Sequence, residues 1–252
     1  DPASPSRTKL AVADALSNRV LIWNKVPLST AELRPPDVVL GQSGFTTTTP
    51  NTSGISAKTL NRPGSIASDG TYLIVGDQSN RRVLFWQGIP NQSGMPADAV
   101  WGQRNFNAAT LPTIASGTVA ASPWVASATT PGGPLFVTDT TFHRVLSFSA
   151  IPFQKPTQPA SFVVGQVNSS TQVPGTAGNA LSVPVGATLV EGQTLTVADT
   201  SNNRVLSYSL PLQADGPTAT TTLGFACPTK TASASCLALP SGAAVTSCGA
   251  TA

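Results

Sequence analysis

The chain has 252 residues, which is enough for one large domain with a substantial core. Only 10% of the residues are charged, against about 25% in an ordinary soluble domain, and the formal net charge is +3. The basic residues are scattered and no apolar run approaches the roughly 18 residues of a membrane helix, so we expect neither nucleic-acid binding nor membrane insertion. With so few charged residues, the polar surface must consist mainly of Ser, Thr, Asn and Gln. This composition favours a secreted, extracellular or cell-envelope protein.

The first predicted element is a β-hairpin that begins at Leu10. A short β-rich run ends at Asp14, a polar turn follows, and a second run starts with Arg19-Val20-Leu21. Two β-rich runs joined by a short polar turn predict a hairpin. The same order of residues occurs four times, with the turn aspartate and the strand arginine at Asp14 and Arg19, Asp77 and Arg82, Asp139 and Arg144, and Asp199 and Arg204.

Two further strands are predicted after each hairpin. The first ends on a glycine and is followed by a long polar insert, and the second opens at a proline with small residues. The four arginines are 63, 62 and 60 residues apart, and a period this regular indicates one supersecondary unit copied four times. The glycines are Gly41, Gly102, Gly165 and Gly224, and the prolines are Pro63, Pro123, Pro184 and Pro240.

Four antiparallel strands per repeat predict the blade of an all-β propeller. Three blades are expected at 62–103, 122–166 and 183–224. The first blade combines 9–42 with a C-terminal strand at 240–252, which joins the three N-terminal strands. This pairing closes a ring of four blades and leaves no exposed sheet edge.

The repeat resembles a known family. The order Asp199-x-x-Asn-Asn-Arg204-Val-Leu after a Leu-x-Val-Ala strand, with a proline and a small-residue strand before it, is similar to the NHL repeat. The repeats here are longer than usual for that family and are predicted to number four. They resemble a long-repeat variant of bacterial secreted and envelope proteins, which implies the same location for this chain.

One face of the predicted propeller carries the polar turns together with the inserts. Turns between the second and third strands of each blade lie on the same side as the connections between blades. Loops on a rigid scaffold are frequent sites of binding, so this face is the predicted binding surface. The inserts cover 43–61, 104–122, 167–183 and 225–239.

The repeated aspartate and arginine have two interpretations. Four arginines around one channel mouth could hold a carboxylate or phosphate. Alternatively, each aspartate caps its turn and pairs with the next arginine, and the fourfold repetition favours this structural role. The position before each arginine varies and provides candidate binding residues, with an exposed turn residue as the alternative: Asn18, Arg81, His143 and Asn203.

Trp124 interrupts the small residues of an inner strand. It is a candidate for ligand stacking, although filling of the core or channel is favoured. The three cysteines lie near the C-terminus, where a Cys227–Cys236 bridge would close the shortest loop; the other pairings and three free thiols stay open.

The predicted function is a non-catalytic binding module for a protein or glycan partner. An NHL-type lyase or hydrolase is disfavoured because a single histidine cannot supply a transition-metal site with several His ligands. No cofactor is predicted, although Ca2+ held by Asp side chains and carbonyls stays open. The alternative is a structural subunit of an extracellular assembly or filament, because a low charge density removes repulsion between copies.

Overall fold

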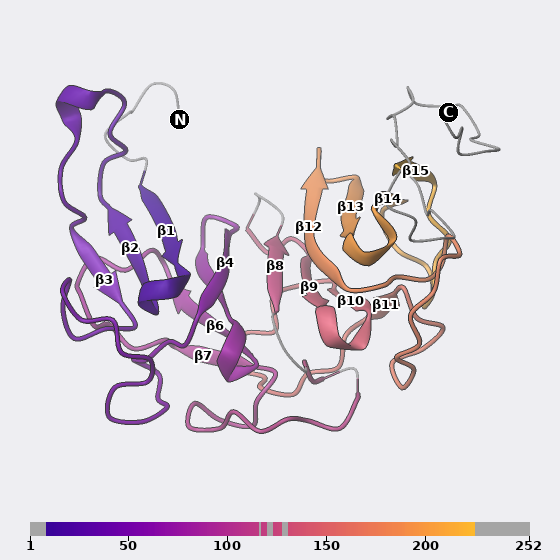
Figure 1. Ribbon diagram of the computed structural model, residues 1–252, viewed down its shortest axis with the longest axis horizontal. Coiled ribbons are helices and arrows are strands. Elements are labelled where there is room, and N and C mark those ends of the chain that lie inside the picture. Colours follow the sequence, from indigo (N-terminus) through magenta and orange to yellow (C-terminus); the bar gives the residue numbers. More distant parts are fainter. Residues whose placement is uncertain (1–8, 116, 120–122, 128–130, 225–252) are drawn as a thin grey trace, which may run out of the picture.

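The computed structural model describes residues 9–115, 117–119, 123–127 and 131–224. Within these residues the fold is all β, with fifteen strands in four antiparallel sheets that follow one another along the chain (Figure 1). Sheet 1 contains β1 (Leu10–Asp14), β2 (Arg19–Trp23) and β3 (Val38–Leu40). The other sheets each have four strands: sheet 2 β4 (Pro63–Ser68), β5 (Tyr72–Asp77), β6 (Arg82–Gln87) and β7 (Ala99–Trp101); sheet 3 β8 (Trp124–Ser127), β9 (Leu135–Asp139), β10 (Arg144–Phe148) and β11 (Phe162–Val164); sheet 4 β12 (Pro184–Val190), β13 (Thr194–Asp199), β14 (Arg204–Ser209) and β15 (Thr221–Gly224).

The central hairpin of every sheet has one register. Its turn aspartate is the last residue of one strand and stands opposite the arginine that begins the next. A single turn of 3-10 helix joins the two strands: η2 (Ala15–Ser17), η4 (Gln78–Asn80), η5 (Thr140–Phe142) and η6 (Thr200–Asn202). A fifth such turn, η3 (Thr30–Glu32), lies in the connection from β2 to β3. The predicted hairpins are therefore present at all four repeats.

The four sheets stand side by side in an arc, with sheet 1 at one end and sheet 4 at the other (Figure 1). The inner strands β4, β8 and β12 contact one another in succession, and β1 lies against β4. Successive residues of a strand point to opposite faces of its sheet, so sheets 2 and 3 bury both faces against neighbouring sheets, whereas sheets 1 and 4 each have one neighbour in the arc. The core is accordingly made of three layers, one for each junction between consecutive sheets.

The prediction of an all-β fold built from repeated four-stranded antiparallel sheets is confirmed for sheets 2, 3 and 4. Sheet 1 has three strands among the described residues. The strand expected at 240–252, and Cys227 and Cys236, lie outside the described residues. Sheets 1 and 4 are the two ends of the arc and not neighbours, so the described structure is an arc of sheets and does not show a closed ring (Figure 1).

In the described part of the chain, no helix has the length and apolar character needed to cross a membrane.

Candidate functional site

Every repeat contains an ion pair between its turn aspartate and its strand arginine. In sheet 2, Arg82 Nε donates to Asp77 Oδ2 over 2.7 Å, and neither side chain is exposed. The pairs of sheets 3 and 4 are also buried, whereas Arg19 and Asp14 in sheet 1 are 17% and 29% exposed. Buried charges of this kind are tolerated only when they are paired and hydrogen-bonded.

The arginine of sheet 2 also holds the backbone of two inserts. Its Nη2 donates to Ser56 O over 3.0 Å and to Thr59 O over 2.8 Å, both in the insert that precedes the sheet. Its Nη1 donates to Phe106 O in the insert that follows. Four of the five N–H donors of Arg82 are therefore used within the protein.

The arginine of sheet 3 repeats this arrangement. Arg144 Nη2 donates to Ala115 O over 2.9 Å and to Thr118 O over 3.0 Å in the preceding insert. Its Nη1 donates to Ser169 O over 2.8 Å in the following insert. We call this arrangement the arginine clamp: one guanidinium that joins the end of one insert to the start of the next.

The clamps of the two end sheets differ from this pattern. Arg204 Nη2 donates to Ala177 O and Ala180 O, each over 2.9 Å, in the insert that precedes sheet 4. Arg19 Nη1 donates to Phe45 O in the insert that follows sheet 1. Within the described residues, no carbonyl partner is found for Arg19 Nη2, which corresponds to the half of the clamp that faces a preceding insert.

The aspartates complete the same network. Asp77 Oδ1 accepts from Asn61 N over 2.8 Å, and its Oδ2 accepts from Asn80 Nδ2 over 2.8 Å in addition to Arg82. Burial raises the pKa of the Asp77 carboxyl, while the Arg82 charge and these hydrogen bonds oppose that rise. Because both partners are engaged in this way, the pairs act as internal staples and are not arranged to hold a ligand anion.

A glutamine that was not assigned a role from the sequence fastens the start of each described insert. Gln42 Nε2 donates to Asn18 O over 3.1 Å and to Thr49 O over 3.0 Å. Gln103 and Gln166 make the same two kinds of bond. All three are 4% exposed. In the sequence, only the recurring Gly-Gln pair after the third strand of these repeats indicates these glutamine hydrogen bonds.

The four candidate residues that precede the arginines share a backbone conformation. They follow the 3-10 turns with φ between 52° and 54°, in the left-handed region that asparagine adopts more readily than most residues. Histidine is also enriched in this region, so the conformation accounts for asparagine and histidine at three of the four positions and leaves arginine as the unusual one. The four are Asn18, Arg81, His143 and Asn203.

Three of these side chains bind nearby backbone. Asn18 Oδ1 accepts from Arg62 N over 2.8 Å, and its Nδ2 donates to Thr48 O over 2.8 Å. Arg81 Nη1 donates to Ala109 O over 3.0 Å. Each therefore ties its turn to a neighbouring insert.

In sheet 3, His143 has the role that Asn18 has in sheet 1. Its Nδ1 accepts from Val183 N over 3.0 Å, so this nitrogen carries no proton. Burial lowers the pKa of His143, and the charge of Asp199 opposes that effect. Asn203 is exposed. The four positions lie in four different sheets, and the structure does not bring them together in one pocket.

Trp124 is the first residue of β8 and is half-buried. Its backbone N donates to Thr138 Oγ1 over 3.2 Å across the sheet. It therefore begins the inner strand opposite Thr138, which directly precedes the turn aspartate Asp139.

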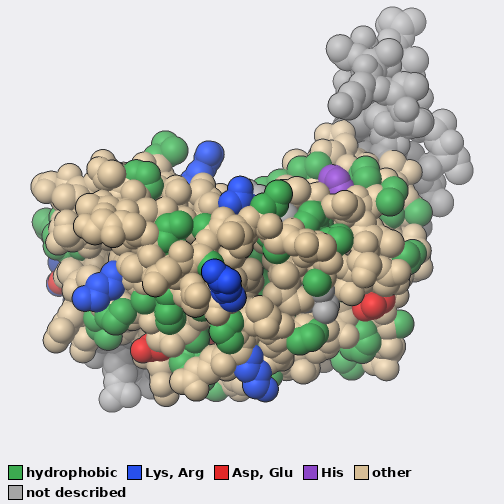
Figure 2. Space-filling view, turned by 90° about the horizontal axis from the view of Figure 1, so that it is seen from below, with side chains coloured by type: hydrophobic (Ala, Val, Ile, Leu, Met, Phe, Trp, Pro, Cys, Tyr) green, Lys and Arg blue, Asp and Glu red, His purple; other side chains and the backbone are tan. Residues whose placement is uncertain are grey.

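Figure 2 shows the molecule from below, the side on which the 3-10 turns and the inserts lie in Figure 1. Charged side chains are few on this side, which we call the insert face, and hydrophobic side chains are scattered among polar ones (Figure 2). Exposed large hydrophobic residues of its turns and inserts are Leu16 at 85%, Phe45 at 43%, Leu111 at 67%, Val167 at 65% and Val173 at 70%. The face thus offers aliphatic contacts with hydroxyl and amide groups around them.

No group of three or more His, Cys, Asp and Glu side chains that could share a metal ion occurs in the described part of the chain.

No protein-family model matches the chain, and no curated protein matches it. Among solved structures, one similar chain is the hydrazine synthase of Kuenenia stuttgartiensis, with 16% sequence identity and a TM-score of 0.38. That match covers 67% of this chain and 36% of the hydrazine synthase chain.

Proposed function

We propose that this protein is a non-catalytic binding module of a secreted or envelope-associated bacterial protein, and that its insert face holds a protein or glycan partner. The arginine clamp is the observation that carries this proposal. Buried guanidinium groups fix the backbone of consecutive inserts to the sheets, so the loops are ordered before a partner arrives. Ordering loops in advance lowers the entropic cost of binding.

The chemistry of the insert face favours a partner with little charge. Its exposed groups are aliphatic side chains, hydroxyls and amides, with few ionised side chains (Figure 2). Such a surface gains little from ionic attraction and binds through shape, apolar contact and neutral hydrogen bonds. A neutral glycan or an uncharged protein surface fits this description.

Exposed leucines on opposite sides of the arc provide a matched test. Leu16 and Leu111 lie on the insert face and are 85% and 67% exposed, whereas Leu28 and Leu33 lie in the β2–β3 connection on the other side and are 75% and 70% exposed. Each of the four leucines is replaced singly by aspartate. The binding of each variant to a glycan array and to isolated envelope and secreted proteins is then measured. We expect Leu16→Asp and Leu111→Asp to lose the partner and the other two to retain it; equal binding by all four would refute the proposal.

We propose further that the arc is completed as an NHL-like propeller of four blades, in which 240–252 adds the missing inner strand to sheet 1. In sheets 2, 3 and 4 the inner strands β4, β8 and β12 pair with β5, β9 and β13, whereas among the described residues no strand pairs with the corresponding edge of β1. The outer face of sheet 1 is also more exposed than its counterparts. Val12 is 39% exposed, while the equivalent Val75, Val137 and Val197 are fully buried.

The free half of the clamp at Arg19 supports the same proposal. The insert ends that bind the other clamps have similar sequences, Ser56-Ala-Lys-Thr-Leu-Asn-Arg-Pro and Ala177-Gly-Asn-Ala-Leu-Ser-Val-Pro. Residues 233–240, Ser-Ala-Ser-Cys-Leu-Ala-Leu-Pro, are a further copy of this segment. We expect them to supply the carbonyl groups for Arg19 Nη2.

The connection is long enough for one chain to complete its own arc. Fifteen residues separate Gly224 from Pro240, and they can span up to about 50 Å when extended. Pairing within one chain is also favoured by the high effective concentration of a tethered strand. Completion by a second copy would instead produce the dimers or filaments of a structural subunit, and the two outcomes differ in solution mass.

A further inference from the structure

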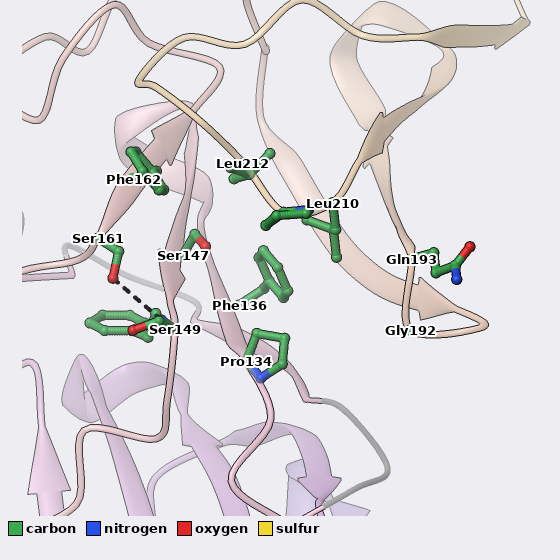
Figure 3. A pocket seen from close by; sticks show the side chains of 12 residues that line it. Pro134, Phe136, Ser147, Ser149, Ser161, Phe162, Gly192, Gln193, Leu210 and Leu212 are labelled. Carbon is green, nitrogen blue, oxygen red and sulfur yellow. Dashed lines mark hydrogen bonds between the residues drawn. The ribbon is translucent and has the colours of Figure 1, made fainter.

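A cavity of about 710 Å³ lies between sheets 3 and 4, on the side opposite the insert face. It opens near the β12–β13 turn at Gly192 and the β14–β15 connection at Pro211. Figure 3 shows Phe136 and Ser147 of sheet 3 facing Leu210 and Leu212 of that connection. Its volume is in the range of sites that bind small molecules.

Three positions at this junction carry smaller side chains than their counterparts at the preceding junction. Between sheets 2 and 3, the rings of Tyr72 and Phe153 pack together with their centroids 4.8 Å apart, and Phe85 is buried in the same layer. The repeat places Pro134 at the position of Tyr72, Ser147 at that of Phe85, and Leu212 at that of Phe153. The rings of Tyr72, Phe85 and Phe153 therefore have no aromatic counterpart at these three positions of the next junction.

The wall of the cavity is apolar with neutral polar groups. Phe136, Phe148 and Phe162 provide aromatic surface, and none of the lining residues is charged. Hydroxyl groups of Ser147, Ser149 and Ser161 are available, and Ser161 Oγ accepts from Ser149 N over 3.3 Å at the edge (Figure 3). An ionised ligand would lose its hydration here without gaining a partner charge.

We propose that this cavity is a binding site for a small uncharged aromatic molecule, in particular a phenol. The ring takes the place that the Tyr72 and Phe85 rings occupy at the preceding junction, and the hydroxyl bonds to the serine groups. The tyrosine ring of sheet 2 indicates which ligand size and chemistry such a junction accommodates. This site is separate from the insert face and does not depend on the function proposed for that face.

The probe is 4-methylphenol, which has the structure of a tyrosine side chain. Its binding to the full chain is measured by calorimetry and by NMR shifts of the Leu210 and Leu212 methyl groups. We expect saturable binding at one site with a dissociation constant of about millimolar size, given the small number of atoms in the probe. A lack of saturable binding would overturn the proposal.

Two variants fill the cavity with the side chains of the preceding junction. Ser147→Phe and Leu212→Phe should each weaken binding by at least about tenfold, since the ring position is then occupied. The matched control is Ser207→Phe, at the repeat position of Ser147 in sheet 4 but outside the cavity, and it should bind as the unmodified chain does. If Ser147→Phe fails to fold, the test rests on Leu212→Phe. A folded variant of either kind that binds 4-methylphenol with unchanged affinity would refute the proposed site.

Two further ligands test the class of molecule. The anion 4-methylbenzoate should bind at least about tenfold more weakly than 4-methylphenol, because an ionised group is poorly tolerated in this cavity. N-acetyltyrosinamide has the same ring on a peptide unit and should also bind more weakly. Equal binding of the anion would contradict an uncharged ligand, and tighter binding of the peptide analogue would indicate a polypeptide instead of a small molecule.

Discussion

Arg82 and Asp77 stand opposite each other in the β5–β6 hairpin, joined by a hydrogen bond of 2.7 Å, with both side chains fully buried. The same guanidinium donates to Ser56 O and Thr59 O of one insert and to Phe106 O of the next. One residue therefore couples the stability of a sheet to the order of two loops on the insert face.

Removal of this arginine should destabilise the whole fold. Arg82→Ala leaves the Asp77 charge buried without its partner, and breaking a buried pair of this kind costs about 3–5 kcal/mol. The free energy of unfolding, measured with urea, should fall by that amount.

The pair in sheet 1 serves as the control. Arg19 and Asp14 are partly exposed, so Arg19→Ala should lower the free energy of unfolding by only about 1 kcal/mol. If both variants lost a similar amount of unfolding free energy, burial of the ion pair would not determine how much it stabilises the fold.

The glycine that ends the third strand should not tolerate a methyl group. Gly165 has φ +87°, and a Cβ atom there would lie 2.4 Å from Leu181 Cδ1. Gly165→Ala should cost about 1–2 kcal/mol for the left-handed backbone and about 1–3 kcal/mol more for overpacking. Gly88 also has a positive φ, +79°, but open space around it, so Gly88→Ala should incur only the backbone cost. Equal losses by urea denaturation would refute the proposed clash.

His143 should make stability depend on pH. Burial holds its pKa below 6.5 in the folded protein, so between that lowered pKa and 6.5 the unfolded chain binds more protons than the folded one. The melting temperature should therefore be highest above pH 6.5 and should fall as the pH is lowered through 6.5.

His143→Asn should remove that contribution. Asn18 occupies the equivalent position in sheet 1 and accepts the same backbone hydrogen bond, from Arg62 N. Asparagine also adopts the left-handed conformation readily, so this variant should be at least as stable as the parent at pH 7.5. The difference between the two melting temperatures, followed from pH 7.5 to 5, should widen; a constant difference would show that folding does not change the pKa of His143.

The hairpins were predictable because their signal is local. An aspartate at the end of one strand and an arginine at the start of the next recur with the turn between them, and the structure places Asp77 opposite Arg82 accordingly. The position of the inserts on the side of the 3-10 turns follows from the antiparallel order of strands. Neither inference requires knowledge of how the sheets pack.

Contacts between repeats were not predictable in the same way. The carbonyl partners of Arg82 lie 23 to 26 residues away along the chain, in loops without regular structure. The cavity is lined by Ser147 of β10 and Leu212 of the β14–β15 connection, which belong to different repeats. Such features become visible only when the positions of one junction are compared with those of the next.

The proposed completion of the arc by residues of the same chain is tested most directly by the molar mass, measured by light scattering over a hundredfold range of concentration. We expect 25.7 kDa, the mass of one chain, at every concentration. A mass that corresponds to two or more chains, or that rises with concentration, would contradict completion within one chain and would indicate that neighbouring copies join end to end.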